Sequence, residues 1–206
     1  MKIKICGITN IEDALCAVEN GTDAIGFVFF QQSKRFIHPE EAKKIISQLP
    51  PFVFSVGVFV NENPSRVNEI AKELKLNAVQ LHGNENIEYI NKITFPIIKA
   101  FRVDHNFNWE ILNDYPTKIL LDTFSHTEFG GTGNKFDWQS IPNEIRDKII
   151  LSGGIDAESL TIILNEIKPA AIDLSSSLEI EPGKKDHKKI KTFFEKLQSY
   201  RSNKCY

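Results

Sequence analysis

The chain has 206 residues, 41% hydrophobic content and a formal net charge of -2. This apolar content suffices for one buried core, and the lack of surplus positive charge argues against a nucleic-acid-binding protein. There is no basic-then-apolar leader, and no apolar run approaches the roughly 20 residues that span a bilayer. Cys6, Cys16 and Cys205 lie far apart without a Cys-x-x-Cys pair, so we expect a soluble cytoplasmic protein with neither a disulfide framework nor a zinc site.

Short apolar runs rich in Val, Ile and Phe recur along the chain, and nearly every run is followed by a segment with helical spacing. The predicted strands lie at 3–6, 24–29, 53–60, 78–81, 97–103, 119–121, 149–151 and 170–174. Apolar residues at i, i+3, i+4 and i+7 predict helices in the segments that begin near Ile11, Val67, Leu160 and Ile190. The segment at 107–112 shows the weakest helical pattern.

The predicted helix boundaries coincide with capping residues and prolines. The segment at 9–12, Thr-Asn-Ile-Glu, has the spacing of a capping box with Thr9 as the N-cap. Asn63 followed by Pro64 predicts an N-cap and a proline in the first helical turn, and Pro39 marks the start of the second helix in the same way. The two prolines at 50 and 51 end that helix, because proline lacks an amide hydrogen.

Strict alternation of strands and helices predicts a parallel sheet, since parallel neighbours need a crossover connection. Eight such units fit a (β/α)₈ barrel better than an open sheet of five or six strands. No linker or composition break divides the sequence, so we expect one α/β barrel domain over residues 1–206. The lysines at 184, 185, 188, 189 and 191 form a local basic run, which we interpret as the solvated face of a helix.

Polar residues alternate with apolar ones at the ends of several predicted strands. Ile3 and Ile5 share the face expected to contact the helices, so the residues between and after them point into the barrel. The side chains placed inward in this way are Lys4, Cys6, Gln80, His82, Asp122, Asp173 and Ser175. Each alone could be a small core residue or a helix cap. Together, at the strand ends where such barrels carry out chemistry, they predict an active site.

Two turns built from small residues predict a phosphate site. Gly153 and Gly154 follow the seventh strand, just before a helix expected to begin near Asp156, and Ser175 and Ser176 follow the eighth strand. Small residues let backbone amides approach an anion, and these two turns are the usual phosphate site of such barrels. The glycine-hinged loop at 130–138 lacks the spacing of a Walker P-loop, and no two histidines have the i, i+4 spacing of a metal site. No metal is expected.

Several distinctive motifs extend over essentially the whole chain: KICGIT, DAIGFVFFQQSKRFI, VGVFVN, VQLHG, LLDT, GGTGNKFDW, LSGGI, DLSSSLE and PGKKD. Together they closely resemble the phosphoribosylanthranilate isomerase family of tryptophan biosynthesis. The resemblance implies that Cys6 is the general base, Asp122 the general acid and Arg35 the anchor for the anthranilate carboxylate. It also implies that His82 and Asp173 line the pocket, and that the turns at Gly153-Gly154 and Ser175-Ser176 bind the phosphate. One departure is Ser177, where the family usually has glycine.

The reaction implied by this resemblance is an Amadori rearrangement of a phosphorylated furanosyl amine. It needs an acid to open the ring and a base to remove a carbon-bound proton, and it needs no cofactor because the hydrogen moves as a proton. The inward Lys4 either favours the thiolate of Cys6 or pairs with Asp122 or Asp173. The expected partner is therefore a small phosphosugar, with no nucleic acid and no membrane; the sequence does not indicate the oligomeric state.

Two other interpretations remain open. A related phosphosugar barrel is one: a histidine-pathway isomerase is expected to use two aspartates, and indole-glycerol-phosphate synthase needs a lysine as acid and a longer N-terminal extension. A phosphate-binding barrel that has lost catalysis is the other, although intact Cys6 and Asp122 argue against it.

Overall fold

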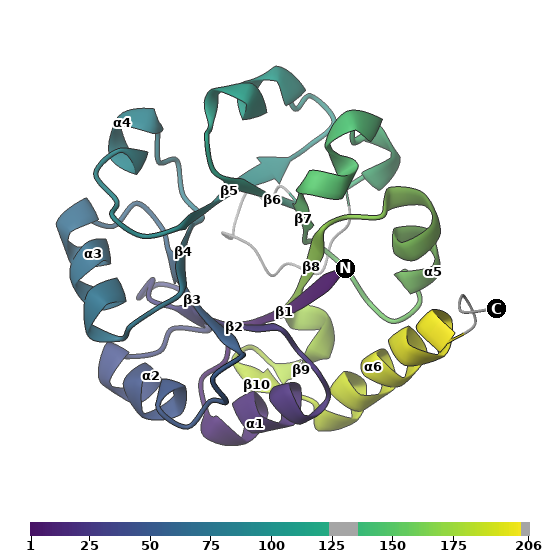
Figure 1. Ribbon diagram of the computed structural model, residues 1–206, viewed down its shortest axis with the longest axis horizontal. Coiled ribbons are helices and arrows are strands. Elements are labelled where there is room, and N and C mark those ends of the chain that lie inside the picture. Colours follow the sequence, from purple (N-terminus) through teal and green to yellow (C-terminus); the bar gives the residue numbers. More distant parts are fainter. Residues whose placement is uncertain (124–135, 203–206) are drawn as a thin grey trace.

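Eight parallel strands follow one another around a closed barrel. The structure, a computed structural model, describes residues 1–123 and 136–202. The strands are β1 (Lys2–Cys6), β2 (Ala24–Val28), β3 (Phe54–Phe59), β4 (Ala78–Leu81), β5 (Ile97–Val103), β6 (Lys118–Thr123), β7 (Ile150–Leu151) and β8 (Ala171–Leu174). Figure 1 shows them as an inner ring with the helices outside it. The predicted barrel and all its predicted strands are confirmed, with small differences at the strand ends.

The helical layer is less regular than the strand layer. The α-helices are α1 (Ile11–Glu19), α2 (Pro39–Ile46), α3 (Pro64–Glu73), α4 (Ile87–Ile90), α5 (Leu160–Ile162) and α6 (His187–Ser202). The short helices η1 (Trp109–Asp114), η2 (Trp138–Ser140) and η3 (Asn143–Lys148) are of the 3₁₀ type, and α5 continues as a π-helix, η4 (Ile163–Ile167). The weak helical pattern at 107–112 therefore corresponds to a 3₁₀ helix. The predicted loop at 130–138 lies mostly outside the described residues, as does Cys205.

The predicted caps are confirmed for two helices and wrong for the first. The Asn63 side chain accepts a hydrogen bond from a first-turn amide of α3, and His38 does the same for α2 with Pro39 at its first position. The N-cap of α1 is Asn10 rather than Thr9, since Asn10 Oδ1 accepts from the amide of Asp13 at 2.8 Å. The Thr9 hydroxyl instead donates to the carbonyl of Gly183, which removes it from the capping position.

The helix after β7 starts later than expected. Asp156 and Ser159 bond each other's backbone, with Ser159 N donating to Asp156 Oδ1 at 2.8 Å and Asp156 N donating to Ser159 Oγ at 3.0 Å. These reciprocal bonds hold a turn, and α5 begins only at Leu160. The two glycines therefore lead into a turn rather than directly into a helix.

The alternation predicted for the strands is confirmed at β1. Ile3 and Ile5 are fully buried in the main core between strands and helices, whereas Cys6 packs in a separate small cluster with Val28 and Val58 inside the barrel. Parallel pairing places Lys4 opposite Asp173 on the neighbouring β8. Successive side chains of a strand thus alternate between an apolar face, which packs against the helices, and a partly polar face inside the barrel.

After β8 the chain forms a small hairpin before the last helix. A 3₁₀ helix, η5 (Ser176–Leu178), leads into the antiparallel strands β9 (Glu179–Glu181) and β10 (Lys184–Lys185). The hairpin is held against α1 because the carboxylate of Asp13 accepts from the amide of Lys185 at 2.7 Å and lies 2.8 Å from His187 Nε2. Figure 1 shows β9 and β10 close to α1. This arrangement brings the hairpin to the C-terminal end of β1.

Candidate active site

Cys6 ends β1 and faces a cavity at the C-terminal end of the barrel. Gly26 on the adjacent β2 leaves room for it, because a Cβ at that position would lie 2.9 Å from Cys6 Sγ and 3.1 Å from Lys4 Cε. Burial raises the pKa of the Cys6 thiol, while the positive charges of Lys4 and Lys185 lower it and the charge of Asp173 raises it. The two lysines thus offset part of the effect of burial on the thiolate.

Lys4 and Asp173 form a buried ion pair on adjacent strands. Lys4 Nζ lies 2.9 Å from Asp173 Oδ2, and both side chains are about 5% exposed. Of the alternatives left open by the sequence, Lys4 therefore pairs with Asp173 and not with Asp122. Burial raises the pKa of Asp173, although Lys4 opposes this shift. Within the described residues, Asp173 Oδ1 has no hydrogen-bond partner, so it is a buried acceptor beside the cavity.

His82 and Asp122 face each other from β4 and β6. His82 Nε2 lies 3.3 Å from Asp122 Oδ2, without the alignment of a hydrogen bond. The other ring nitrogen, Nδ1, lies 2.9 Å from the side-chain nitrogen of Gln80. Asp122 Oδ1 accepts from the amide of Thr123 at 2.8 Å. Asp122 thus keeps one oxygen directed toward His82 and the cavity.

The glycine turn after β7 packs against the end of β6. Gly153 and Gly154 have positive φ values of 86° and 64°. A Cβ at Gly153 would collide with Thr123 and come within 3.0 Å of Asp122 Oδ1, so only glycine fits there without displacing the carboxylate. The amides of these two glycines donate to no acceptor in the described part of the chain. Ser177, in η5, does not have a positive φ, so serine fits this position without strain.

Arg35 also lines the cavity, but its guanidinium has an intramolecular partner that the sequence did not reveal. Arg35 Nε donates to Glu179 Oε1 at 2.9 Å, and Nη2 donates to Glu179 Oε2 at 2.7 Å. The Arg35 side chain crosses Gly7, where a Cβ would lie 2.6 Å from Arg35 Cδ. Hydrogen bonds from Arg35 and the charge of Lys185 outweigh burial and lower the pKa of Glu179.

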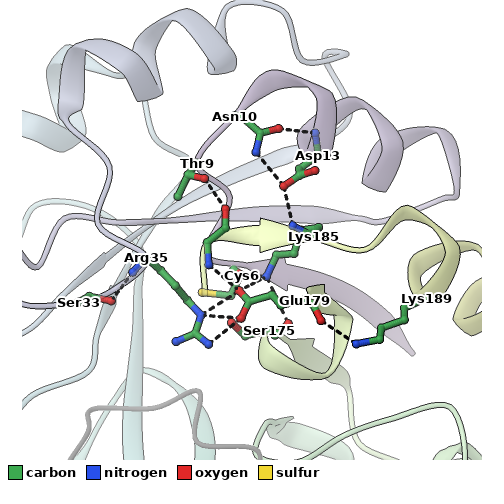
Figure 2. Close-up of polar contacts among 11 residues, drawn as sticks. Cys6, Thr9, Asn10, Asp13, Ser33, Arg35, Ser175, Glu179, Lys185 and Lys189 are labelled. Carbon is green, nitrogen blue, oxygen red and sulfur yellow. Dashed lines mark hydrogen bonds and ion pairs between the residues drawn. The ribbon is translucent and has the colours of Figure 1, made fainter. Parts of the chain in front are cut away.

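The interpretation of the basic run as a solvated helix face is wrong for Lys185. This residue lies in β10, before α6 begins, and its side chain is 0% exposed. Its ammonium group contacts Glu179 and the carbonyl oxygens of Cys6 and Ser175, as Figure 2 shows. The signal that could have revealed this is the Pro-Gly pair at 182 and 183, which is typical of a tight turn. A hairpin around it buries Lys185 and leaves Lys184 exposed.

A second buried lysine supports the strand ends on the side of His82, and no sequence signal singled it out. Lys99 Nζ lies 2.7 Å from the carbonyl oxygen of Gly83, 3.3 Å from that of Leu81 and 2.8 Å from Glu85 Oε2. The Glu85 carboxylate also accepts from the amides of Gly83 and Asn61. These contacts fix the backbone on both sides of His82.

One cavity therefore collects six of the nine predicted site residues. Those on its wall are Cys6, Arg35, His82, Asp122, Asp173 and Ser175. The other three, Gly153, Gly154 and Ser176, lie in the turns after β7 and β8 and are not part of this wall. A thiol and a carboxyl group that face one cavity can move protons between themselves and a bound molecule.

In residues 1–123 and 136–202, no three His, Cys, Asp or Glu side chains converge to hold a metal ion. None of the helices described here combines the length and apolar character needed to cross a bilayer.

The fold and the site define a barrel enzyme with acid–base groups at the C-terminal ends of its strands. The family described as N-(5'phosphoribosyl)anthranilate (PRA) isomerase matches residues 3–196. The N-(5'-phosphoribosyl)anthranilate isomerase of Thermotoga maritima is 49% identical over 199 residues, covering 94% of this chain and 96% of that protein. That of Trichlorobacter lovleyi is 44% identical over 196 residues, with the same coverage. The chain belongs to the N-(5'-phosphoribosyl)anthranilate isomerase family.

Solved structures agree with this assignment. The crystal structure of the Thermotoga maritima enzyme superposes with a TM-score of 0.88 at 46% identity, over 97% of this chain and 99% of that chain. A second structure of a phosphoribosyl anthranilate isomerase holds reduced 1-(o-carboxyphenylamino)-1-deoxyribulose 5-phosphate. It superposes with a TM-score of 0.83 at 45% identity, over 97% of this chain and 99% of that chain.

Proposed function

We propose that this chain converts N-(5-phospho-β-D-ribosyl)anthranilate to 1-(2-carboxyphenylamino)-1-deoxy-D-ribulose 5-phosphate in tryptophan biosynthesis, with Cys6 as general base and Asp122 as general acid. Family membership supports the reaction. The observation that carries the residue roles is the shared cavity, which Cys6 enters from β1 and Asp122 from β6. These strands lie in different parts of the barrel, so an acid and a base can exchange protons with different atoms of one bound substrate.

The reaction begins with transfer of a proton from Asp122 to the ring oxygen of the ribose. The bond between that oxygen and the anomeric carbon breaks, and the nitrogen lone pair forms a Schiff base. Thr123 donates to one oxygen of Asp122, which leaves the second oxygen, beside His82, to carry the proton. His82 Nε2 lies 3.3 Å from this second oxygen, close enough for the ring to stabilise the carboxylate that remains after transfer.

The second step removes the proton from the neighbouring sugar carbon. The Cys6 thiolate takes this proton, and the electron pair moves to form an enolamine that rearranges to the ketone. Because burial raises the pKa of the thiol, Lys4 and Lys185 are needed to keep a reactive fraction of thiolate. In the last step the former anomeric carbon gains a proton and the enol hydroxyl loses one, which gives the ketone, so the hydrogen is transferred as a proton throughout.

The remaining cavity residues have binding roles in this proposal. Arg35 holds the anthranilate carboxylate, for which a planar guanidinium is suited. The unpartnered oxygen of Asp173 accepts from a substrate N–H or O–H group. The amides after β7, at Gly153 and Gly154, together with Ser175 and Ser176 after β8, bind the phosphate. We place the reaction in the cytoplasm, where the free thiol of Cys6 stays reduced.

The test is turnover by the purified protein. Loss of phosphoribosylanthranilate is followed by its fluorescence in the presence of the wild-type chain and of a Cys6→Ser variant. We expect turnover by the wild type and its near-complete loss in the variant. A wild-type protein that binds product but does not consume substrate would instead identify a binding barrel that has lost catalysis.

A further inference from the structure

The ammonium group of Lys185 lies where the C-terminal ends of β1 and β8 meet the β9–β10 hairpin. Lys185 Nζ is 2.7 Å from the carbonyl oxygen of Cys6, 2.8 Å from Glu179 Oε1 and 3.3 Å from the carbonyl oxygen of Ser175. Figure 2 shows this group between the backbone of Cys6 and the Glu179 carboxylate. Three acceptors require three N–H donors, so the lysine is bound in its charged form.

These contacts fix the backbone of the residue that carries the thiol. The Cys6 carbonyl is held by Lys185, and the next amide, that of Gly7, donates to the carbonyl of Gly26 at 3.0 Å. The peptide that follows Cys6 is thus held at both its carbonyl and its N–H, which leaves little freedom in the direction of the Cys6 side chain.

The same lysine is connected to the second proposed site residue through Glu179. Glu179 Oε1 is shared between Lys185 Nζ and Arg35 Nε, and Oε2 accepts from Arg35 Nη2. The aliphatic part of Arg35 in turn lies on Gly7. Cys6 and Arg35 therefore belong to one continuous network, although they come from different segments of the chain, and Lys185 is the member that contacts both the backbone of one and the counter-ion of the other.

We propose that Lys185 is a positioning residue for the isomerisation: it fixes the carbonyl of the base Cys6 and, through Glu179, the guanidinium of the anchor Arg35, so that base and anchor keep one relative arrangement. This inference rests on the proposed function of Cys6 and Arg35. Lys185 is not a catalytic residue, since its donors are all directed at protein acceptors rather than into the cavity.

The proposal has a consequence for the reactivity of the thiol. The charged groups around Cys6 are Lys4 from β1, Asp173 from β8 and Lys185 from β10. Farther along the same network and cavity lie Arg35, Glu179, His82 and Asp122. Because the charge of Lys185 lowers the pKa of the Cys6 thiol, its removal shifts thiol ionisation to higher pH. A residue that only contributed to folding would not change this ionisation in molecules that remain folded.

The experiment uses a Cys16→Ser/Cys205→Ser parent, in which Cys6 is the only thiol. In this parent, Lys185→Met removes the charge and donors of Lys185 at similar length. Its matched control, Lys99→Met, removes another buried lysine that holds two carbonyls and a glutamate. Each protein is alkylated with iodoacetamide across a pH series to obtain the ionisation midpoint of Cys6, and kcat and KM are measured with phosphoribosylanthranilate.

In Lys185→Met we expect a midpoint at higher pH and a kcat/KM that is lower by roughly ten- to a hundredfold, the effect of a misplaced catalytic group. In Lys99→Met the midpoint stays at the parent value. A folded Lys185→Met protein with the parent midpoint overturns the proposal.

Two further outcomes are also decisive. If Lys185→Met does not melt cooperatively, the experiment uses the Glu179→Gln variant instead. Removing the negative charge of Glu179 is expected to move the ionisation midpoint of Cys6 to lower pH. It is also expected to raise KM, because Arg35 loses its charged partner. An unchanged midpoint and KM in that variant overturn the proposal. If the parent shows no turnover, the proposed function fails, and the alkylation midpoints still test whether Lys185 controls Cys6.

Discussion

Two buried lysines, Lys185 and Lys99, support opposite sides of the same barrel. Each ammonium group bonds two backbone carbonyls and one glutamate near a strand end that carries a proposed site residue. The surroundings of the two glutamates differ. Within residues 1–123 and 136–202, the other hydrogen bonds to Glu85, the partner of Lys99, come from backbone amides, and the Lys99–Glu85 pair itself has no net charge. Glu179 is shared between Lys185 and Arg35, so one carboxylate here binds two cationic side chains.

A buried lysine–glutamate pair that binds two backbone carbonyls can therefore serve two purposes. On the His82 side it fixes backbone shape without adding a net charge. On the Cys6 side it fixes shape and also supplies the field that a buried thiolate requires. The proposed base and the proposed acid, which would need opposite protonation states at the start of the reaction, therefore lie in different electrostatic surroundings.

The largest expected effect is the loss of turnover on replacing the proposed base, Cys6, or the proposed acid, Asp122, which lie on the two sides of the barrel compared above. Cys6→Ser replaces the thiol with an alcohol too weak to ionise near neutrality, and Asp122→Asn keeps the shape of the acid without its proton. Each should lower kcat by roughly a hundred- to ten-thousandfold, the usual effect of positioned acid–base groups. Product affinity, measured by fluorescence titration, should survive in both. Cys16→Ser is the control, and near-wild-type turnover in Cys6→Ser would exclude it as the base.

The second prediction tests whether the two lysine pairs are equally important for stability. Lys185→Met and Lys99→Met each remove the lysine partner of a buried glutamate and a donor to two backbone carbonyls, so each should lower the free energy of unfolding by about 3–5 kcal/mol. Urea unfolding followed by circular dichroism measures the change. Lys43→Met, which removes an exposed ion pair with Glu73, should leave stability nearly unchanged. A small effect at only one of the buried lysines would mean that the pairs are not equivalent.

A third prediction concerns the space around the thiol. Gly26→Ala places a methyl group against Cys6 Sγ and Lys4 Cε, so we expect lower kcat together with a loss of about 1–3 kcal/mol of stability. Gly57→Ala is the matched control on the neighbouring strand, because its methyl group would meet Leu76 and two phenylalanines instead. The control should lose stability and keep its turnover per folded molecule. Equal kcat values for the two variants would contradict a special role for Gly26.

The fourth prediction concerns the planar geometry of the Arg35 guanidinium. Arg35→Lys keeps the charge but loses the planar fork that pairs with Glu179 and is proposed to hold the substrate carboxylate. We expect KM to rise roughly tenfold, equivalent to about 1.4 kcal/mol, with a smaller effect on kcat. Unchanged affinity for both substrate and product would remove Arg35 from the binding site.

The smallest effect is a pH dependence of stability. Glu179 has a lowered pKa in the folded protein, so it stabilises the fold above its ordinary pKa of 4.5, and this contribution is lost as pH falls through the lower folded value. Glu179→Gln should therefore lose less stability than the wild type when unfolding is measured in urea from pH 6 down to about pH 3. Parallel pH curves for the two proteins would show that the Arg35–Glu179–Lys185 network is not linked to protonation in this range.

Much of the fold followed from the sequence because buried parallel strands leave a strong local signal. Each strand is a short apolar run, and inward polar residues such as Lys4 and Asp122 interrupt that run with the expected alternation. Asp122 lines the cavity, and Lys4 pairs with Asp173, another residue of the cavity wall.

What could not be predicted depends on contacts between distant segments. Lys185 belongs to a run of lysines that normally marks a solvated helix, and only the two-residue strand β10 turns it inward. The partner of Arg35, Glu179, lies 144 positions away in sequence, a distance over which local patterns carry no information. The N-cap of α1 was misplaced for the same reason, since Thr9 bonds a residue of the distant hairpin.

The closure of β1 against β8 sets the order in which the site can assemble during folding. Lys4 pairs with Asp173 across 169 positions, and Lys185 reaches the Cys6 carbonyl across 179. Contacts of such high sequence separation form late, because the entropy of a long loop must be lost before they contribute. On a ribosome, the segment around Cys6 emerges first yet waits for the hairpin before its thiol has its final surroundings. The surroundings of the proposed base are thus completed by one of the last folding steps.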